Sequence, residues 1–271
     1  MPELPEVQTT LAGISPYLVG QKIKGVTVRV PKLRWPIPHN LAALLKDATI
    51  ASIARRAKYL LFSTQKGTLI VHLGMSGRLQ ILKAFVPTEK HDHVDITLKN
   101  GTVMRYTDPR RFGAFLWTVN HPLSHPLLKA LGPEPLQKSF NGQYLWQRAT
   151  SKKISVKVFI MDSKVVVGVG NIYAAESLFD AKINPNRPAQ SLSLDDCARL
   201  CVSIKKVLRA AIKKGGTTLK DFLGSDGSKG YFSLKLKVYG RGNLPCVTCF
   251  EALTESRLGQ RSTAYCQHCQ V

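Results

Sequence analysis

Two residues at the start of the sequence combine a nucleophile with an acid. If Met1 is removed, Pro2 presents a secondary amine, which attacks an aldehyde-like sugar carbon and yields an iminium cation that acts as an electron sink. The carboxyl group of Glu3 is close enough in the chain to manage the protons of such a reaction. Many chains begin with Met-Pro only because proline protects the terminus, so this pair is a catalytic candidate only if the rest of the chain supports it.

A second group of chemically competent residues lies near the C-terminus. Cys246 and Cys249 form one C-x2-C pair, Cys266 and Cys269 form another, and sixteen residues separate the two pairs. This spacing is typical of a structural zinc site, in which four thiolates complete a closed tetrahedron. We therefore expect one structural Zn²⁺ ion, with no place left for His268 among its ligands.

The segment between the two cysteine pairs is expected to form a β-hairpin over residues 254–264, with Arg257 and Arg261 facing outward. An arginine in that position suits a phosphate, although a merely solvated arginine fits the residue type equally well. The remaining cysteines, Cys197 and Cys201, lie four residues apart on an apolar stripe. We interpret them as small core residues rather than as a metal-binding pair.

The charge balance indicates a polyanionic partner. The chain carries 39 Lys and Arg residues against 17 Asp and Glu residues, a formal net charge of +22 over 271 residues. Because the basic residues are spread over the whole chain, we expect a basic surface on folded domains that binds nucleic acid. The sequence has neither an apolar leader behind a basic start nor an apolar run of membrane length. This predicts an intracellular protein without a membrane partner, in which six cysteines do not indicate a disulfide framework.

Elements that could hold the terminal pair follow it directly. Apolar residues at helical spacing over 7–18 predict a helix directly behind Pro2. The period then changes to two, with alternating valines over 26–30 and a buried run over 69–73, and Asn100-Gly101 marks a hairpin between strands. The N-terminal half is therefore predicted to be mostly β, with a helix in front of it.

The second half of the chain is predicted to be a separate, mainly helical domain. Prolines between residues 120 and 143 indicate the crossing between the domains, with one or two helical turns over 127–131. A long helix follows, for which Ser193 is the expected N-cap and Asp196 completes a capping box. Gly215 is expected to end this helix.

Seven motifs occur in order along the chain and carry a resemblance to a known family. They are Met1-Pro2-Glu3-Leu4-Pro5-Glu6, Lys58-Tyr59-Leu60, His72-Leu73-Gly74-Met75-Ser76-Gly77, Asp108-Pro109-Arg110-Arg111-Phe112-Gly113, Gly168-Val169-Gly170-Asn171-Ile172-Tyr173, Gly215-Gly216-Thr217-Thr218, and Gln260-Arg261-Ser262-Thr263 with the cysteine pairs. Together they resemble the bacterial formamidopyrimidine-DNA glycosylases, and the resemblance runs from end to end. Each motif is weak alone, but seven in register are highly specific.

The resemblance implies an α+β fold in three parts. An N-terminal helix and a two-layer β-sandwich form the catalytic domain at residues 1–131. A helical domain with a helix–two-turn–helix element binds DNA at 132–236, and a zinc-finger β-hairpin occupies 237–271.

The resemblance also implies a base excision repair enzyme, monomeric and located in the bacterial cytoplasm. It would remove oxidised purines, such as 8-oxoguanine and formamidopyrimidines, from double-stranded DNA and then cleave the strand by β,δ-elimination through a Schiff base on Pro2. Two alternatives remain open. One is an oxidised-pyrimidine glycosylase of the endonuclease VIII type, whose start has Gly where this chain has Leu4. The other is a non-catalytic zinc-finger DNA-binding protein, which has no need of a free Pro2.

Four residues match the family's catalytic set. Pro2 matches the nucleophile, and Glu3 matches the acid that assists opening of the sugar ring. Lys58 matches a lysine of the catalytic site, and Arg261 matches an arginine of the zinc finger that grips a phosphate. Glu6 also matches a family carboxylate, but a role at the start of the helix is an equal alternative.

The other matched residues are expected to contact DNA. Met75, Arg110 and Phe112 match the set that fills the void left by a flipped base, and the choice of Arg110 over Arg111 depends on the family's Arg-x-Phe pattern. The remaining expected DNA contacts are His93, Lys153 and Asn171.

The chain departs from the family pattern at a few positions. Phe250 stands where the family usually has Gly after the second cysteine, and Gln267 stands where Pro commonly follows the third. Residues 225–231 match the loop that closes over the flipped base. The segment 233–235 lacks the polar pair expected behind that loop, which leaves the loop's behaviour open.

Overall fold

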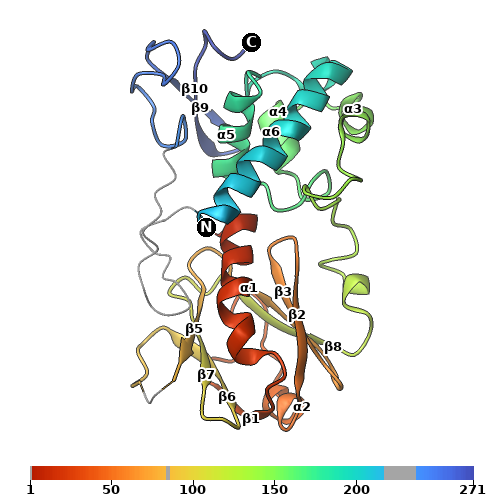
Figure 1. Ribbon diagram of the computed structural model, residues 1–271, viewed down its shortest axis with the longest axis vertical. Coiled ribbons are helices and arrows are strands. Elements are labelled where there is room, and N and C mark those ends of the chain that lie inside the picture. The colour runs from red at the N-terminus through yellow and green to blue at the C-terminus, as the bar shows by residue number, and fades with distance from the viewer. Residues whose placement is uncertain (1, 84–85, 217–235) are drawn as a thin grey trace. The chain divides into compact units, whose positions relative to one another are not determined.

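The computed structural model describes residues 2–83, 86–216 and 236–271 (Figure 1). The chain forms two compact units, Met1–Lys129 with Gly215–Phe232, and Ala130–Lys214 with Ser233–Val271. The loop expected at 225–231 and the segment 233–235 lie outside the described residues. Each unit is described by itself below.

Helix α1 (Leu4–Leu18) begins directly behind Glu3, as predicted. Pro5 lies in its first turn, where proline is tolerated because the first backbone N–H groups have no helical partner. The side-chain Oε2 of Glu6 accepts the N–H of Glu3 at 2.9 Å, so Glu6 closes the start of the helix. The helix packs an apolar face into the unit, contacts strands of both sheets (Figure 1), and fully buries Leu4 and Leu18.

The N-terminal unit contains two antiparallel sheets of four strands each. The first sheet has the order β1-β6-β7-β5, formed by Ile23–Val28, Asp92–Leu98, Val103–Thr107 and Arg78–Leu82. The second has the order β2-β3-β4-β8, formed by Ile50–Arg56, Tyr59–Thr64, Gly67–His72 and Ala114–Thr118. The short helix α2 (Leu41–Leu45) contacts β1. One apolar core contains buried residues of both sheets and of α1, which confirms the predicted sandwich.

The local predictions for this unit are largely confirmed. The Asn100-Gly101 pair lies in the turn between β6 and β7, where Gly101 has a φ of 87°. The run predicted at 69–73 is strand β4 and its exit. Strand β1 ends at Val28, so Val30 lies beyond it. Residues 127–130 form turns in which the N–H groups of Leu128 and Lys129 both donate to the carbonyl of His125, and a short 3-10 helix, η1, lies earlier at Pro122–Ser124.

A buried network of ion pairs crosses the first sheet. The guanidinium of Arg105 on β7 donates to both carboxylate oxygens of Asp95 on β6, at 2.9 and 3.0 Å, and lies 3.3 Å from Asp92. Arg29 approaches Asp95 from the other side at 2.6 Å. Burial by itself raises the pKa of Asp95, but the hydrogen bonds from Arg105 and Arg29 outweigh it and hold that pKa below its ordinary value.

The second unit contains α3 (Gly142–Ala149), α4 (Val156–Met161), α5 (Asn171–Asp180), the 3-10 helix η2 (Ala189–Ser191), α6 (Leu194–Lys213) and the strand pair β9 (Thr254–Leu258) and β10 (Arg261–Tyr265). The capping box predicted for α6 is present, with Ser193 accepting from the N–H of Asp196. Cys197 and Cys201 are both buried in the apolar face of α6, which confirms them as core residues.

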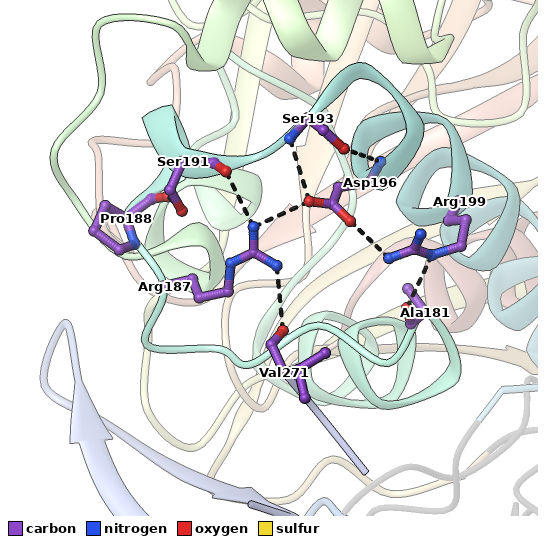
Figure 2. Close-up of polar contacts among 8 residues, drawn as sticks. All are labelled: Ala181, Arg187, Pro188, Ser191, Ser193, Asp196, Arg199 and Val271. Carbon is purple, nitrogen blue, oxygen red and sulfur yellow. Dashed lines mark hydrogen bonds and ion pairs between the residues drawn. The ribbon is translucent and has the colours of Figure 1, made fainter.

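The carboxylate of Asp196 also organises the turn in front of α6. Figure 2 shows Arg187 and Arg199 donating to its two oxygens, at 3.0 and 2.6 Å. A second guanidinium nitrogen of Arg187 reaches the carbonyl oxygen of Val271 at 3.2 Å. Arg187 therefore ties Val271 to the carboxylate that takes part in the capping box of α6. Within the described residues, no helix combines the length and the apolar character required to traverse a bilayer.

Arg105→Met is expected to lower the free energy of unfolding at pH 7 by about 3–5 kcal/mol, because it leaves the Asp95 charge buried without its bidentate partner. Since the folded pKa of Asp95 is depressed, the stabilisation is complete above the unfolded pKa of about 3.9 and is lost as the pH falls through the folded value. The deficit of the variant should therefore shrink in acid. Guanidinium unfolding across pH measures this.

A matched control is Lys99→Met, which removes an exposed ion pair of 2.9 Å with Asp47. Exposed pairs contribute little to stability, so this variant should unfold almost as the wild type does. Equal losses in the two variants would contradict the role assigned to the buried network.

Candidate functional site

The structure holds the terminal pair against the core. Pro2 and Glu3 are both buried in front of α1, with Glu3 2% exposed. Glu6 is 1% exposed and lies against the backbone of Gly216, where a Cβ would come within 3.0 Å of its Oε1. Gly216 also has a φ of 86°, a second reason for glycine at this position. The contact of Glu6 with the N–H of Glu3 shows that it has the structural role left open by the sequence.

Lys58 lies in the tight turn between β2 and β3. Ala57 in this turn has a φ of 54°, which bends the chain back sharply. Arg55 fastens the turn to α1, since its Nε donates to Gln8 at 2.9 Å and its Nη1 donates to the carbonyl of Ala57 at 2.8 Å. The helix that begins behind Pro2 and the turn that carries Lys58 are thus connected directly.

His72 is a neighbour of this turn that the sequence analysis passed over. It pairs with Tyr59 across β3 and β4, and the two rings lie 4.7 Å apart. Desolvation of the ring, followed by the charges of Lys58 and Arg34, lowers the pKa of His72 to about 4. Its Nδ1 accepts the N–H of Gly74 at 3.0 Å, which fits a neutral ring at neutral pH. The only sequence signal was its place in the motif before Met75.

The structure brings Met75, Arg110 and Phe112 onto two adjoining loops. A Cβ at Gly74 would overlap the backbone of Phe112, so the two loops touch along their main chains. The guanidinium of Arg110 lies 5.1 Å from the ring centre of Phe112, whose side chain is 44% exposed. Arg110 is exposed and Met75 is partly exposed. Arg111 has a φ of 54°, and its backbone N–H turns back to the carbonyl of Asp108 at 3.2 Å.

His93, one of the expected DNA contacts, is buried in the N-terminal unit. It is 1% exposed, and its Nε2 lies 2.8 Å from the carbonyl oxygen of Asp108, so the ring is part of the interior. His91 is the more accessible ring of this pair, 6.4 Å away centre to centre. The DNA contact expected of His93 stays a prediction. Its burial was not visible in the sequence because the partner of its ring, the carbonyl of Asp108, lies 15 residues further along the chain.

The other predicted residues belong to the second unit. Asn171 is the first residue of α5, and its Nδ2 donates to the carbonyl of Ser262 at 3.3 Å, just behind Arg261 on β10. Arg261 is exposed, and Lys153 is exposed between α3 and α4.

Lys157 is a second residue that the sequence analysis missed. Although charged, it is fully buried, and its Nζ donates to Thr263 at 2.8 Å and to the carbonyl of Ser262 at 3.2 Å. It therefore joins α4 to the strand that begins with Arg261. Its signal in the sequence was a lone lysine within the apolar helix Val156–Met161.

The four cysteines of the two C-x2-C pairs converge on one point. All four Sγ atoms lie within 4.8 Å of one another, with 4.0 Å between Cys246 and Cys269 and 3.4 Å between Cys249 and Cys266. Zn–S bonds of about 2.3 Å in a tetrahedron place sulfurs ~3.8 Å apart, so the spacing suits such an ion. The N–H of Thr248 also approaches the Sγ of Cys246 at 3.4 Å. The cluster can therefore bind a metal ion.

Phe250, the departure from the family pattern, adopts the backbone conformation that favours glycine. Its φ is 66°, and its side chain is 77% exposed. Its N–H closes the first cysteine turn by donating to the carbonyl of Cys246 at 3.1 Å. A left-handed conformation costs an L-residue roughly 1–2 kcal/mol. The backbone of Phe250 is therefore strained, and this strain destabilises the turn.

Phe250→Gly is expected to make the metal-loaded finger more stable by about 0.5–1 kcal/mol, since relief of the left-handed strain exceeds the extra chain entropy of glycine. Slower loss of metal to a competing chelator measures this. Phe250→Ala is the control, because it removes the ring but keeps the Cβ and hence the strain. Equal gains in the two variants would attribute the effect to the ring instead.

Comparison with known proteins gives the same assignment along the whole chain. The formamidopyrimidine-DNA glycosylase N-terminal domain matches residues 1–115, and the H2TH domain of that family matches 131–222. A formamidopyrimidine-DNA glycosylase of Pseudomonas putida (strain W619) is 54% identical over 270 residues, which is 100% of both chains.

Two solved structures of the Lactococcus lactis Fpg are also similar. The complex with DNA containing an abasic site has a TM-score of 0.90 at 32% identity and covers 99% of both chains. The complex with DNA containing N7-benzyl-Fapy-dG has a TM-score of 0.89 at 32% identity, again with 99% of both chains covered. The chain is a member of the formamidopyrimidine-DNA glycosylase family.

Proposed function

We propose that this DNA glycosylase removes oxidised purines, 8-oxoguanine and formamidopyrimidines, from double-stranded DNA and then cleaves the strand at the abasic site. The observation that carries the proposal is the placement of Pro2 and Glu3 at the buried head of α1. Family membership and the charge of +22 support DNA as the substrate.

The chemistry follows from the terminal amine. With Met1 removed, the nitrogen of Pro2 attacks C1′ of the damaged nucleotide and displaces the base, while Glu3 supplies a proton to the sugar ring oxygen. The ring opens and the C1′–N bond becomes an iminium cation. That cation acidifies the C2′ proton, so its loss expels the 3′ phosphate, and a second elimination expels the 5′ phosphate. Water then releases Pro2.

Lys58 and Arg261 complete the proposed catalytic set. Lys58 contributes a positive charge near His72, on the turn that Arg55 joins to α1. This charge would stabilise the negatively charged DNA strand at the site of reaction. Arg261 is exposed at the start of β10, and the carbonyl next along the strand is held by Lys157 and Asn171. A guanidinium on an anchored strand suits a phosphate flanking the lesion.

The two loops that carry Met75, Arg110 and Phe112 supply the means to extract the base. A base leaves its stack at a cost of a few kcal/mol, and apolar and aromatic side chains recover part of it by filling the hole. The guanidinium of Arg110 can bond the base left without its partner. This set distinguishes the purine enzyme from an oxidised-pyrimidine glycosylase, as does Leu4 at the head of the helix.

The remaining DNA contacts are proposed on accessibility. Lys153 is exposed, and Asn171 keeps one N–H of its amide for a phosphate after donating the other to Ser262. His93 stays a proposed contact on the resemblance alone, and we propose His91, which is more exposed, beside it.

We further propose that the metal of the cysteine cluster is a single Zn²⁺ ion with a structural role. Four cysteines leave no open coordination position, so the ion would hold the finger rather than take part in the chemistry. Cys246, Cys249, Cys266 and Cys269 would hold it.

Blocking the amine is expected to abolish chemistry but not binding. Inserting one glycine before Pro2 turns its nitrogen into an amide, which cannot form an iminium. Borohydride trapping on a duplex with 8-oxoguanine opposite cytosine should then fall on the order of 10³-fold or more, while gel-shift affinity stays near that of the wild type. Intact mass must show that the wild type has lost Met1. Undiminished trapping by the insertion variant would refute Pro2 as the nucleophile.

Zinc content should depend on the cluster alone. Cys249→Ser is expected to release the ion and to weaken binding to damaged and undamaged duplex alike, because the strand pair that bears Arg261 loses its anchor. Elemental analysis should give about one zinc per wild-type chain. Cys201→Ala, a buried cysteine outside the cluster, should keep its zinc. Retention of zinc by Cys249→Ser would contradict the assignment.

A further inference from the structure

Asp108 is a fully buried carboxylate for which the proposed chemistry has no use. It directly follows β7 and opens the loop 108–113 that carries Arg110 and Phe112. A buried carboxylate is costly unless hydrogen bonds satisfy it, so its partners indicate its role.

Three donors converge on this carboxylate. The Oγ of Ser76 donates to Oδ1 at 2.6 Å, and the hydroxyl of Tyr106 and the N–H of Gly113 donate to Oδ2 at 3.0 and 2.9 Å. Burial raises the pKa of Tyr106, and the charge of Asp108 raises it further, so the tyrosine keeps the proton that it donates. Bonds to ionised acceptors are about twice as strong as neutral ones.

Ser76 connects Asp108 to the other loop. Its Oγ donates to Asp108 and accepts the N–H of Arg110 at 3.2 Å. Ser76 follows Met75 directly in the loop 73–77. One hydroxyl therefore lies between the carboxylate, the backbone of Arg110 and the residue next to Met75.

The two loops are matched crossings between the sheets. Loop 73–77 leads from β4 to β5, and loop 108–113 leads from β7 to β8. The strands pair at both ends, with Arg78 opposite Thr107 and His72 opposite Ala114. The strand pairing stops between these two pairs of residues. There the two loops are joined instead by the hydrogen bond from Ser76 to the carboxylate of Asp108.

Backbone contacts and glycines fix the position further. The N–H of Asp108 donates to the carbonyl of His91 at 3.0 Å, and its own carbonyl lies 2.8 Å from the Nε2 of His93. A Cβ at Gly77 would come within 2.5 Å of the Tyr106 hydroxyl, and a Cβ at Gly113 would overlap it. The buried His93 thereby has a role, as part of the support of Asp108.

We propose that Asp108 is a positioning residue, which holds Met75 on one loop and Arg110 with Phe112 on the other in the mutual arrangement required to enter DNA. The inference rests on the proposed function, because it assumes that these three side chains replace a flipped base. Side chains that fill a void must be held to a fraction of an ångström, and small misplacements are costly in rate. Asp108 itself touches neither the base nor the sugar.

Asparagine has nearly the same shape as aspartate, but its side chain cannot accept hydrogen bonds at both terminal atoms. An amide offers one acceptor oxygen and one NH₂ donor in place of two acceptor oxygens. Its NH₂ group would therefore face either Ser76 or the N–H of Gly113. With the NH₂ group facing Ser76, the serine hydroxyl must accept instead of donate, and the bonds from Tyr106 and Gly113 end on a neutral acceptor, so all three links are altered or weakened.

The test compares Asp108→Asn with Asp47→Asn, an exposed aspartate whose φ of 60° asparagine tolerates. Single-turnover release of 8-oxoguanine is measured opposite cytosine and opposite adenine, and borohydride trapping is measured on an abasic site in single-stranded DNA. For Asp108→Asn we expect duplex release to fall on the order of tenfold or more, with weaker preference for cytosine. Single-strand trapping should stay near wild type, because no stack needs filling there.

The outcomes separate the inference from the proposed function. If the wild type neither releases 8-oxoguanine from the duplex nor traps the abasic site, the proposed function itself is wrong. If the wild type traps and folded Asp108→Asn keeps both its duplex rate and its preference for cytosine, the positioning role is overturned. A parallel loss of single-strand trapping also overturns it, since a general defect would then account for the loss.

Ser76→Ala keeps the test decisive if Asp108→Asn does not fold. This change leaves the bonds from Tyr106 and Gly113 to Asp108 and removes only the link between the loops. It should show the same pattern in a weaker form, with reduced preference for cytosine and normal trapping on single strands. An unchanged preference for cytosine would overturn the inference.

Discussion

The chemistry depends on a constraint that chain termini rarely meet, because a nucleophile at the end of the chain must not move. Termini fray unless they are packed. Here the helix starts two residues behind Pro2, its apolar face is buried, and Glu6 accepts the N–H of Glu3. The first turn of α1 therefore fixes the position of the terminal residues. Gly216 lies against Glu6 from a distant part of the chain, so the terminus is held from two directions.

Buried carboxylates provide the corresponding support elsewhere. Asp108 accepts three hydrogen bonds and links two crossings of the sandwich through one of them, the bond from Ser76. Glu176 on α5 does the same in the second unit, where it accepts the backbone N–H groups of Lys237, Val238 and Tyr239 at 2.9–3.1 Å. Both bind segments that lack a regular partner strand or helix. A carboxylate suits this task because it accepts from several directions at once and does not compete as a donor.

The sequence predicted those features whose causes are local. The capping box at Ser193, the turn at Asn100-Gly101 and the C-x2-C pairs each depend on a few neighbouring residues, and the structure contains all three. The first helix was equally visible from its apolar spacing. Such signals survive folding because the residues that make them are already adjacent in the chain.

The failures concern partners that are distant in sequence. Nothing near Glu176 indicates that its acceptors serve a segment 61–63 residues away, and Lys157 finds its partners more than 100 residues downstream. The burial of His93 was not visible because its partner, the carbonyl of Asp108, lies 15 residues away. The positive φ of Phe250 could not be predicted, because phenylalanine rarely adopts this backbone conformation. The candidate residues were thus found largely by type and motif, while their supports required the fold.

The distribution of charge connects these supports to DNA binding. Acidic residues are drawn inward in the described part of the chain, where the buried ones are Glu3, Glu6, Asp92, Asp95, Asp108 and Glu176. The buried cations there are Arg105 and Lys157. The solvent-facing surface is therefore more basic than the formal charge of +22 conveys. A buried carboxylate surrounded by donors also repels a phosphate less than an exposed one does, because the donors compensate its charge. Because these carboxylates are buried and hydrogen-bonded, they hold the loops in place without weakening the positive electrostatic potential that attracts the DNA backbone.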